Sequence, residues 1–357
     1  MILPFKKLYF VWFRFGGGAT AGCYQPWLAC HEMGIPAGVL SAVELVKNIS
    51  SIRDSAIFIM KERVNQKLID VLRNNNNTVI RYAGDGVELE ERKYFKRIKN
   101  LNGVIVGSNE YRDIVEGNCE NTLAAVIPAN RDMFLDRETY SDHRNKSFKL
   151  YFGGKRAVGG VNDGFLIQGD LGLKDSFDYE EGYFHSLKYV AENMKNLPSR
   201  EVEKYVLDIA KKGLCKSLED LKTSYENPSK YSCHYAVRAP FAKSSDGKVY
   251  KEYDQWNTKT GGKVSTAAAS GANIVTSLDP SVRVLIDENY PYAIDTTTDY
   301  FRDNHDEICK EMVIKARETF DTKIWHDGLS ILESVRERTE IKNIVSEYVD
   351  FIKRFYE

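Results

Sequence analysis

The segment WNTKTGGKVSTAAASGANIVTS, residues 256–277, combines several residue types that bind phosphate. Lys259 and Lys263 flank two glycines, and Ser265 and Thr266 open a run made almost wholly of Ala and Ser, which we expect to be a helix. The first turn of a helix offers backbone N–H groups and partial positive charge, and glycines let a ligand approach the backbone closely. The segment therefore predicts a phosphate or diphosphate site. The alternative is a glycine loop before a closely packed helix that binds no ligand.

The segment CHYAVR, residues 233–238, reads as a strand that brings His234, Tyr235 and Arg238 near its end. In open α/β sheets, ligands bind beyond the carboxyl ends of the strands. Arg238 could hold a phosphate or a sugar acid through two parallel hydrogen bonds. His234 could contact phosphate or sugar, or act as an acid or base near neutral pH. A buried, hydrogen-bonded histidine and a surface arginine would fit the same letters, so both interpretations stay open.

Glycines also follow two strand-like runs in the first part of the chain. Gly16, Gly17 and Gly18 come directly after the first run, where they would let a donor or acceptor approach the backbone. They do not complete a dinucleotide fingerprint, so we do not expect NAD. We also expect no other cofactor. Asp85 stands between two glycines just after residues 78–82 and could deprotonate an acceptor hydroxyl. A turn aspartate or a helix cap is the alternative.

A second glycine pair, Gly153 and Gly154, precedes two basic residues, Lys155 and Arg156. These could offset the charge of a diphosphate, or they could be a solvated basic pair. Asp279 follows the strand-like run after the Ala-rich helix, where it could contact a donor or cap the next helix. No Asp-x-Asp motif stands in a convincing strand-end context, so we expect no obligatory metal ion.

The composition is that of a soluble globular protein with room for two domains. The chain has 357 residues and a formal net charge of −1, from 50 basic and 51 acidic side chains. This balance argues against a nucleic-acid binder, which usually carries a basic excess. The six cysteines form no C-x-x-C pair, which favours reduced thiols in a cytoplasmic protein. The apolar run at residues 8–13 is much shorter than the ~20 residues of a membrane-spanning helix.

Alternating strand-like and helix-like runs fill the first 130 residues. We expect strands at residues 8–13, 37–40, 56–60, 78–82, 103–106 and 123–127, with helices at residues 19–33, 64–73, 87–99 and 110–115. Repeated β-α-β units predict a parallel sheet that is covered on both faces, and right-handed crossovers make it a Rossmann-like domain.

A polar stretch at residues 130–146 predicts a linker, after which the pattern restarts. We expect strands at residues 148–152, 232–237, 273–276 and 292–294, helices at 179–193, 199–212, 263–270 and 280–286, and amphipathic helices at 303–319 and 329–355. The predicted fold class is α/β, with two Rossmann-like doubly wound domains that face a cleft and a helical C-terminal tail. The expected ranges are residues 1–145, 146–325 and 326–357.

The pattern KVSTAAASGANIVTS at residues 263–277 resembles the donor-side segment of GT-B glycosyltransferases. GVIVGSNE at residues 103–110 and AVIPANRDMF at residues 125–134 are similar to the end of a GT-B N-terminal domain and its exit toward the hinge. KLYFGG at residues 149–154 looks like the first strand and loop of the C-terminal domain. The resemblance implies that the helix N-terminus contacts the donor diphosphate and that the tail crosses back to the first domain. Thr266 stands where that family often carries a ribose-binding Glu.

The resemblance further implies a metal-independent glycosyltransferase that takes a sugar from a nucleotide-diphosphate or nucleotide-monophosphate donor. The acceptor would be a glycan, a lipid-linked or another hydroxyl, entering from the first domain, with catalytic roles for Asp85 and His234. A lipid-linked acceptor would bring a cytoplasmic protein to the inner membrane surface. A sugar-nucleotide epimerase of the same fold and a non-catalytic two-domain scaffold are the alternatives.

Overall fold

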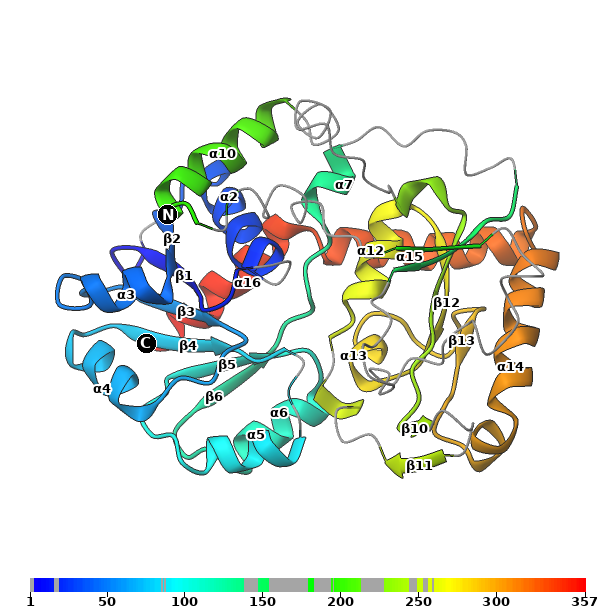
Figure 1. Cartoon of the computed structure of the whole chain (residues 1–357), viewed down its shortest axis with the longest axis horizontal. Helices are drawn as coiled ribbons and strands as arrows, with labels where there is room; N and C mark the ends of the chain where they lie inside the picture. Colours follow the sequence, from blue (N-terminus) through cyan, green and yellow to red (C-terminus); the bar gives the residue numbers. More distant parts are fainter. Residues whose placement is uncertain are drawn as a thin grey trace.

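Two sheets, each built of parallel strands, lie side by side, and helices accompany each of them (Figure 1). The computed structural model describes residues 3–15, 19–84, 86, 88–137, 147–153, 179–182, 194, 196–212, 228–243, 249–252, 256–258 and 260–357. Within these ranges, the first half of the molecule is built mainly from residues before 137 and the second half mainly from later ones. Two segments from the later part of the sequence nevertheless pack on the first half.

The first sheet has six strands in the order β2-β1-β3-β4-β5-β6, all parallel. Their bounds are β1 Leu8–Trp12, β2 Ala37–Ser41, β3 Ala56–Met60, β4 Thr78–Tyr82, β5 Gly103–Val106 and β6 Leu123–Val126. The three strands β3, β4 and β5 are buried along their whole length, as expected for a parallel sheet covered on both faces. The predicted Rossmann-like topology is therefore confirmed for this half.

Successive side chains of a strand point to opposite faces of the sheet, so both faces carry apolar side chains, and helices cover both. Phe10, Phe58 and Ile105 join one apolar cluster, while Val11 and Ile57 join the other. On the first face lie η1 Thr20–Tyr24, α2 Gln25–Glu32, α10 Ser199–Lys212 and α16 Ile341–Lys353; on the second lie α3 Ala42–Asn48, α4 Gln66–Asn74, α5 Glu88–Phe95 and α6 Asn109–Glu116.

The second sheet has five parallel strands in the order β13-β12-β9-β7-β8. Their bounds are β7 Leu150–Gly153, β8 Tyr179–Gly182, β9 Cys233–Ala236, β12 Asn273–Ser277 and β13 Ala293–Ile294. The accompanying helices are α12 Gly262–Ser270, α13 Pro280–Arg283, α14 Asp299–Glu318 and α15 Lys323–Arg338, and the short elements are α7 Met133–Arg137, η3 Pro228–Lys230, η4 Trp256–Thr258 and the hairpin β10 Phe241–Lys243 with β11 Val249–Glu252.

One predicted helix is wrong at its start. Residues 179–193 were expected to be helical, but their first four residues form β8, which pairs with β7 at the edge of the second sheet. An edge strand tolerates the charged sequence YEEG because only one of its sides is paired. Residues 183–193 lie outside the described residues.

The helix α10 comes from the range expected for the second domain but packs on the first half (Figure 1). Its apolar residues Val202 and Val206 join the core around Phe58. The Glu203 carboxylate accepts the Val39 N–H at 2.8 Å, which fixes α10 beside β2. The order of the sequence therefore does not separate the two halves at residue 145.

The C-terminal helices divide between the halves. Trp325 and Leu332 place α15 in the core of the second half, whereas α16 packs across the first sheet, with the Tyr348 and Phe58 rings 4.7 Å apart. The predicted single helix over residues 329–355 is broken after Arg338. At this break the Thr339 carbonyl accepts the Arg131 N–H at 2.9 Å, so the segment that leaves β6 lies beside the link between α15 and α16.

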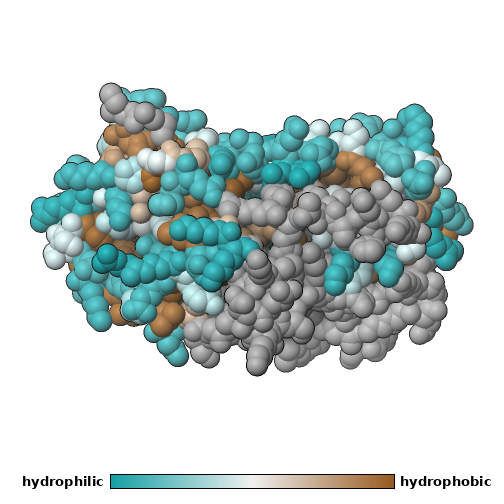
Figure 2. All heavy atoms as spheres, turned by 90° about the horizontal axis from the view of Figure 1, so that it is seen from above, coloured by the Kyte–Doolittle hydropathy of each residue, from teal (hydrophilic) through white to brown (hydrophobic). Residues whose placement is uncertain are grey.

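On the face seen in Figure 2, the described residues are largely hydrophilic, with apolar areas between the polar ones. Within the described ranges, every helix is too short or too polar to pass through a bilayer. Five cysteines among the described residues are buried and form no disulfide: Cys23, Cys30, Cys119, Cys233 and Cys309.

Candidate functional site

The predicted phosphate-binding helix is α12. It ends at Gly271, whose φ of +62° is the left-handed conformation expected at a helix C-terminus. The buried residues Ala267 and Ala268 allow the helix to pack closely on β12 and α15. At the other end, a Cβ on Gly261 would stand 2.8 Å from Leu285 and 3.0 Å from the Ser281 carbonyl, so this turn requires glycine.

The start of α12 lies against the first half of the molecule. Ser265 donates a hydrogen bond from Oγ to the carbonyl of Ala129, 3.0 Å away, in the segment that leaves β6. Thr266 donates to the Gly262 carbonyl at 2.8 Å, within its own helix. Both hydroxyl protons are thus used by the protein. A phosphate at this end of the helix would therefore depend on the backbone N–H groups and on Lys263.

Arg238 supports the loop that leads into α12. It follows β9, and its guanidinium donates to the Thr260 carbonyl at 3.4 Å and to the Asp279 carboxylate at 3.3 Å. Its backbone N–H donates to Ser277 Oγ at 2.9 Å. Arg238 is only 8% exposed, so it joins the carboxyl ends of β9 and β12 to the α12 loop.

Asp279 takes one of the two roles considered for it, the helix cap, and also pairs with Arg238, while contact with a donor stays a prediction. Its Oδ1 accepts the Val282 N–H at 3.0 Å, which caps α13, and its Oδ2 pairs with Arg238. Ser281 donates to the same Oδ1 at 2.7 Å. The carboxylate therefore holds Arg238 in place at the edge of the sheet.

His234 and Tyr235 lie inside the sheet, before its edge. Tyr235 is 1% exposed and belongs to the apolar core of the second half. His234 is 4% exposed, and its Nε2 lies 3.2 Å from the Pro228 carbonyl, so Nε2 carries the donated proton. Burial, reinforced by the charge of Lys263 and opposed by this hydrogen bond, lowers the pKa of His234 to about 4. The position favours the alternative of a buried, neutral histidine, and a catalytic role stays a prediction.

Of the predicted glycines, Gly153 ends β7 and lies opposite Gly182 of β8. The remaining predicted site residues lie outside the described residues: Gly16, Gly17, Gly18, Asp85, Gly154, Lys155, Arg156 and Lys259.

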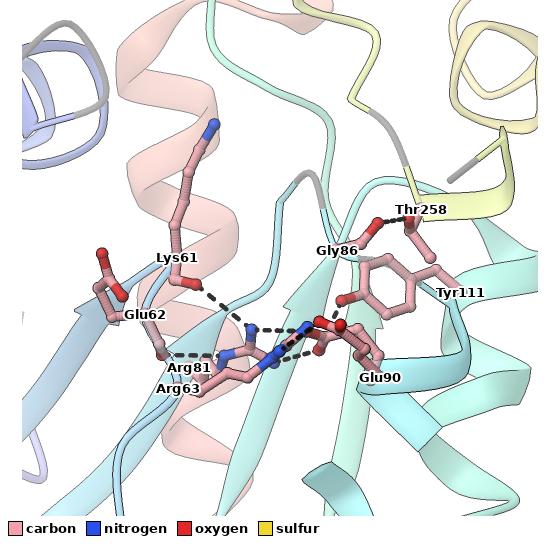
Figure 3. A network of polar contacts seen from close by, with 9 residues as sticks. Lys61, Glu62, Arg63, Arg81, Gly86, Glu90, Tyr111 and Thr258 are labelled. Atoms are coloured by element: carbon pink, nitrogen blue, oxygen red, sulfur yellow. Dashed lines mark hydrogen bonds and ion pairs between the residues drawn. The ribbon is translucent and has the colours of Figure 1, made fainter. Parts of the chain in front are cut away.

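The sequence analysis missed a buried charge cluster in the first half, which Figure 3 shows. Arg81 and Glu91 are each at most 1% exposed and pair at 2.6 Å. The Glu91 carboxylate also accepts from Arg63 at 2.7 Å and from the Tyr111 hydroxyl at 2.9 Å. Burial alone would raise the pKa of Glu91, but the two arginines hold it below its ordinary value. The available signal was one arginine in the otherwise uncharged strand TVIRY.

The same region contacts the second half. The Gly86 carbonyl, next to the cluster, accepts a hydrogen bond from the Thr258 hydroxyl (Figure 3). Ser108, which caps α6, donates to the Asn257 carbonyl at 2.9 Å. A Cβ on Gly86 would stand 2.6 Å from both Glu91 Cγ and the Tyr111 hydroxyl. The cluster thus fixes a loop of the first half against η4, directly before the α12 loop.

No protein-family model matches the sequence, and no curated protein matches it. Solved structures do match. HepE from Anabaena, in complex with UDP and glucose, is 11% identical with a TM-score of 0.55, covering 98% of this chain and 99% of that one. A glycosyltransferase from Rickettsia africae is 9% identical with a TM-score of 0.54, covering 99% of each chain.

An alpha-glucosyltransferase in complex with UDP and a 13-mer DNA is 13% identical with a TM-score of 0.53, covering 97% of this chain and 99% of that one. At these identities the likeness concerns the fold. This chain therefore has the fold of the GT-B glycosyltransferases, as its sequence predicted: two Rossmann-like domains with C-terminal helices.

Proposed function

We propose that this protein is a glycosyltransferase that moves a sugar from a nucleotide-diphosphate donor to a hydroxyl acceptor. The observation that carries the proposal is the position of α12. Its glycine-flanked N-terminus, with Lys263 in the first turn, lies where the second half contacts the segment leaving β6. Similar folds that were solved with UDP or UDP-glucose support a nucleotide-sugar as the donor.

In this proposal the diphosphate binds the first turn of α12. Backbone N–H groups, the helix dipole and Lys263 stabilise the negative charge that develops as the sugar–phosphate bond breaks. Arg238 keeps the α12 loop in place through the Thr260 carbonyl. These groups would act on the leaving diphosphate without a cofactor or an obligatory metal ion.

The acceptor would approach from the first half of the molecule. We assign the base to Asp85, which follows β4 in the sequence and would take the proton from the acceptor hydroxyl. The acceptor oxygen then forms the new bond to the sugar carbon as the nucleoside diphosphate leaves. A glycan or a lipid-linked hydroxyl fits this scheme.

A thermal-shift panel of UDP, GDP, CMP and dTDP sugars tests the donor class. We expect one nucleotide-sugar to raise the melting temperature, since a ligand that binds only the folded state stabilises it. Calorimetry should then show that Lys263→Ala weakens binding by about tenfold, because it removes one charged contact. Lys310→Ala, an exposed lysine on α14, is the matched control and should bind like the wild type.

Two outcomes would contradict the proposal: no nucleotide stabilises the protein, or Lys263→Ala binds as tightly as the wild type. Product analysis with the identified donor separates transfer from epimerisation. A transferase gives a glycosylated acceptor, whereas an epimerase releases an altered nucleotide-sugar when no acceptor is present.

A further inference from the structure

Lys61 has an unusual backbone conformation. Six non-glycine residues in the described ranges have a positive φ, and five of them are Asn or Asp, which tolerate it best. The sixth is Lys61, with a φ of +57°. Its neighbours close a three-residue turn around it, with the Glu62 N–H donating to the Met60 carbonyl at 2.7 Å. Such a turn with positive φ is rare and strained, and strain of this kind concentrates at functional sites.

The buried charge cluster holds Lys61 in this conformation. The Arg81 guanidinium donates to the Lys61 carbonyl at 3.3 Å and to the Glu62 carbonyl at 3.1 Å. The Lys61 N–H in turn donates to the Tyr82 carbonyl at 2.9 Å. Because Arg81 is itself fixed by Glu91, the strained turn is anchored in the core of the first half.

The Lys61 side chain points away from the cluster and toward the second half. Figure 3 shows it leaving the Arg81 ion pairs, at the carboxyl end of β3. Its Cε lies 3.2 Å from where a Cβ of Gly84 would be, and Thr260 Cγ2 also lies 3.2 Å from that point. Thr260 Oγ1 in turn lies 3.9 Å from the Cβ position of Gly262, the first residue of α12.

We propose that Lys61 is a second cationic contact for the diphosphate of the nucleotide-sugar, supplied by the first half opposite Lys263. This inference rests on the proposed function and adds a residue to it. The missing side chain at Gly84 gives the lysine its path across the edge of the sheet, and the strained turn aims it. A diphosphate bound at the start of α12 would then meet a lysine from each half, so donor binding would favour the arrangement in which the halves are in contact.

UDP binding by calorimetry tests this assignment. Lys61→Asn removes the charge but suits the positive φ, so the turn should be kept. We expect this variant to bind UDP about tenfold more weakly, and Lys61→Arg to restore most of the affinity. The loss should shrink as the salt concentration rises, because salt screens the charge. Lys67→Ala, an exposed lysine on α4, is the control and should bind normally.

Equal UDP affinity for Lys61→Asn and the wild type, with both variants folded by circular dichroism, would overturn the role of Lys61. That result would leave the proposed function intact if Lys263→Ala still weakens binding. A wild-type protein that binds no nucleoside diphosphate would instead remove the proposed function itself, so the two failures are distinguishable.

Discussion

Each half of the molecule buries an arginine–carboxylate pair near the carboxyl edge of its sheet, and the two pairs differ in how completely the protein encloses them. Arg81 and Glu91 are each 1% exposed in their side chains, and Glu91 is also bound by Arg63 and Tyr111. The Arg238 side chain is 9% exposed, and its Nη1 lies 3.3 Å from Oδ2 of Asp279. The first pair sits inside the core, whereas the second lies at the loop into α12.

The difference indicates different tasks. A fully enclosed pair must be complete, because removing one partner leaves an uncompensated buried charge. A pair at a loop can hold that loop and still respond to a ligand. We therefore expect substitutions at the first pair to change mainly stability and substitutions at the second pair to change mainly ligand binding.

The largest effect should follow Arg81→Ala. This change leaves Glu91 buried without its main partner and frees the Lys61 turn, so the free energy of unfolding should fall by about 3–5 kcal/mol. Urea unfolding measures the loss. Arg112→Ala, which breaks an exposed pair with Asp113, should cost at most about 1 kcal/mol. Similar losses for the two variants would show that the enclosed pair contributes no more to the free energy of unfolding than an exposed pair.

A smaller effect should appear in the pH dependence of the second half. The pKa of His234 is lowered to about 4, while an unfolded histidine titrates near ~6.5. Between these values the unfolded state binds a proton that the folded state excludes, so stability falls by up to about 3 kcal/mol as the pH drops through this window. The pKa of Glu91 is lowered in the folded protein, so the stability that its ionised carboxylate contributes is lost only as the pH falls below the ordinary carboxylate value of ~4.3.

His234→Gln should therefore flatten the melting-temperature profile between pH 4 and 6.5 and leave the steeper loss at lower pH. His326→Gln, at an exposed histidine on α15, is the control for the substitution itself. A His234→Gln profile that matches the wild type would show that folding does not lower the pKa of His234.

The smallest change in stability should follow Arg238→Lys. A lysine keeps the charge but is shorter than arginine, so the contacts of Arg238 Nη1 with the Thr260 carbonyl and the Asp279 carboxylate should weaken, and we expect a loss of about 1 kcal/mol. Nucleotide binding, measured by calorimetry, should weaken by several-fold because the α12 loop loses its support. If the variant loses stability but binds nucleotide normally, the Arg238–Asp279 pair serves stability alone, as we expect for Arg81 and Glu91.

The sequence predicted the strands of the first half well because buried parallel strands read as short apolar runs between turn residues. Residues 56–60, 78–82 and 103–106 were placed without error. The end of α12 was equally readable, since Gly271 is the residue type that a left-handed helix terminus needs.

Tertiary choices were not readable in the same way. The periodicity of α10 shows that one face of the helix is buried but not which sheet it packs on. In the structure α10 packs on the first sheet. The break between α15 and α16 follows from packing on two different cores. Lys61 gives no signal in the sequence, because nothing about a lysine predicts a positive φ; the long-range contacts of Arg81 impose it.

The return of α16 to the first sheet also bears on how the protein is made. This helix covers Phe58 and approaches Gly103 so closely that a Cβ there would stand 2.8 Å from the Phe351 ring. Its residues are translated after the whole second half. When a ribosome has made only the first six strands, η1 and α2 are the only ones of the described helices available to cover this face, and α10 and α16 are still missing. This half of the protein therefore completes its core only after the other half has been synthesised.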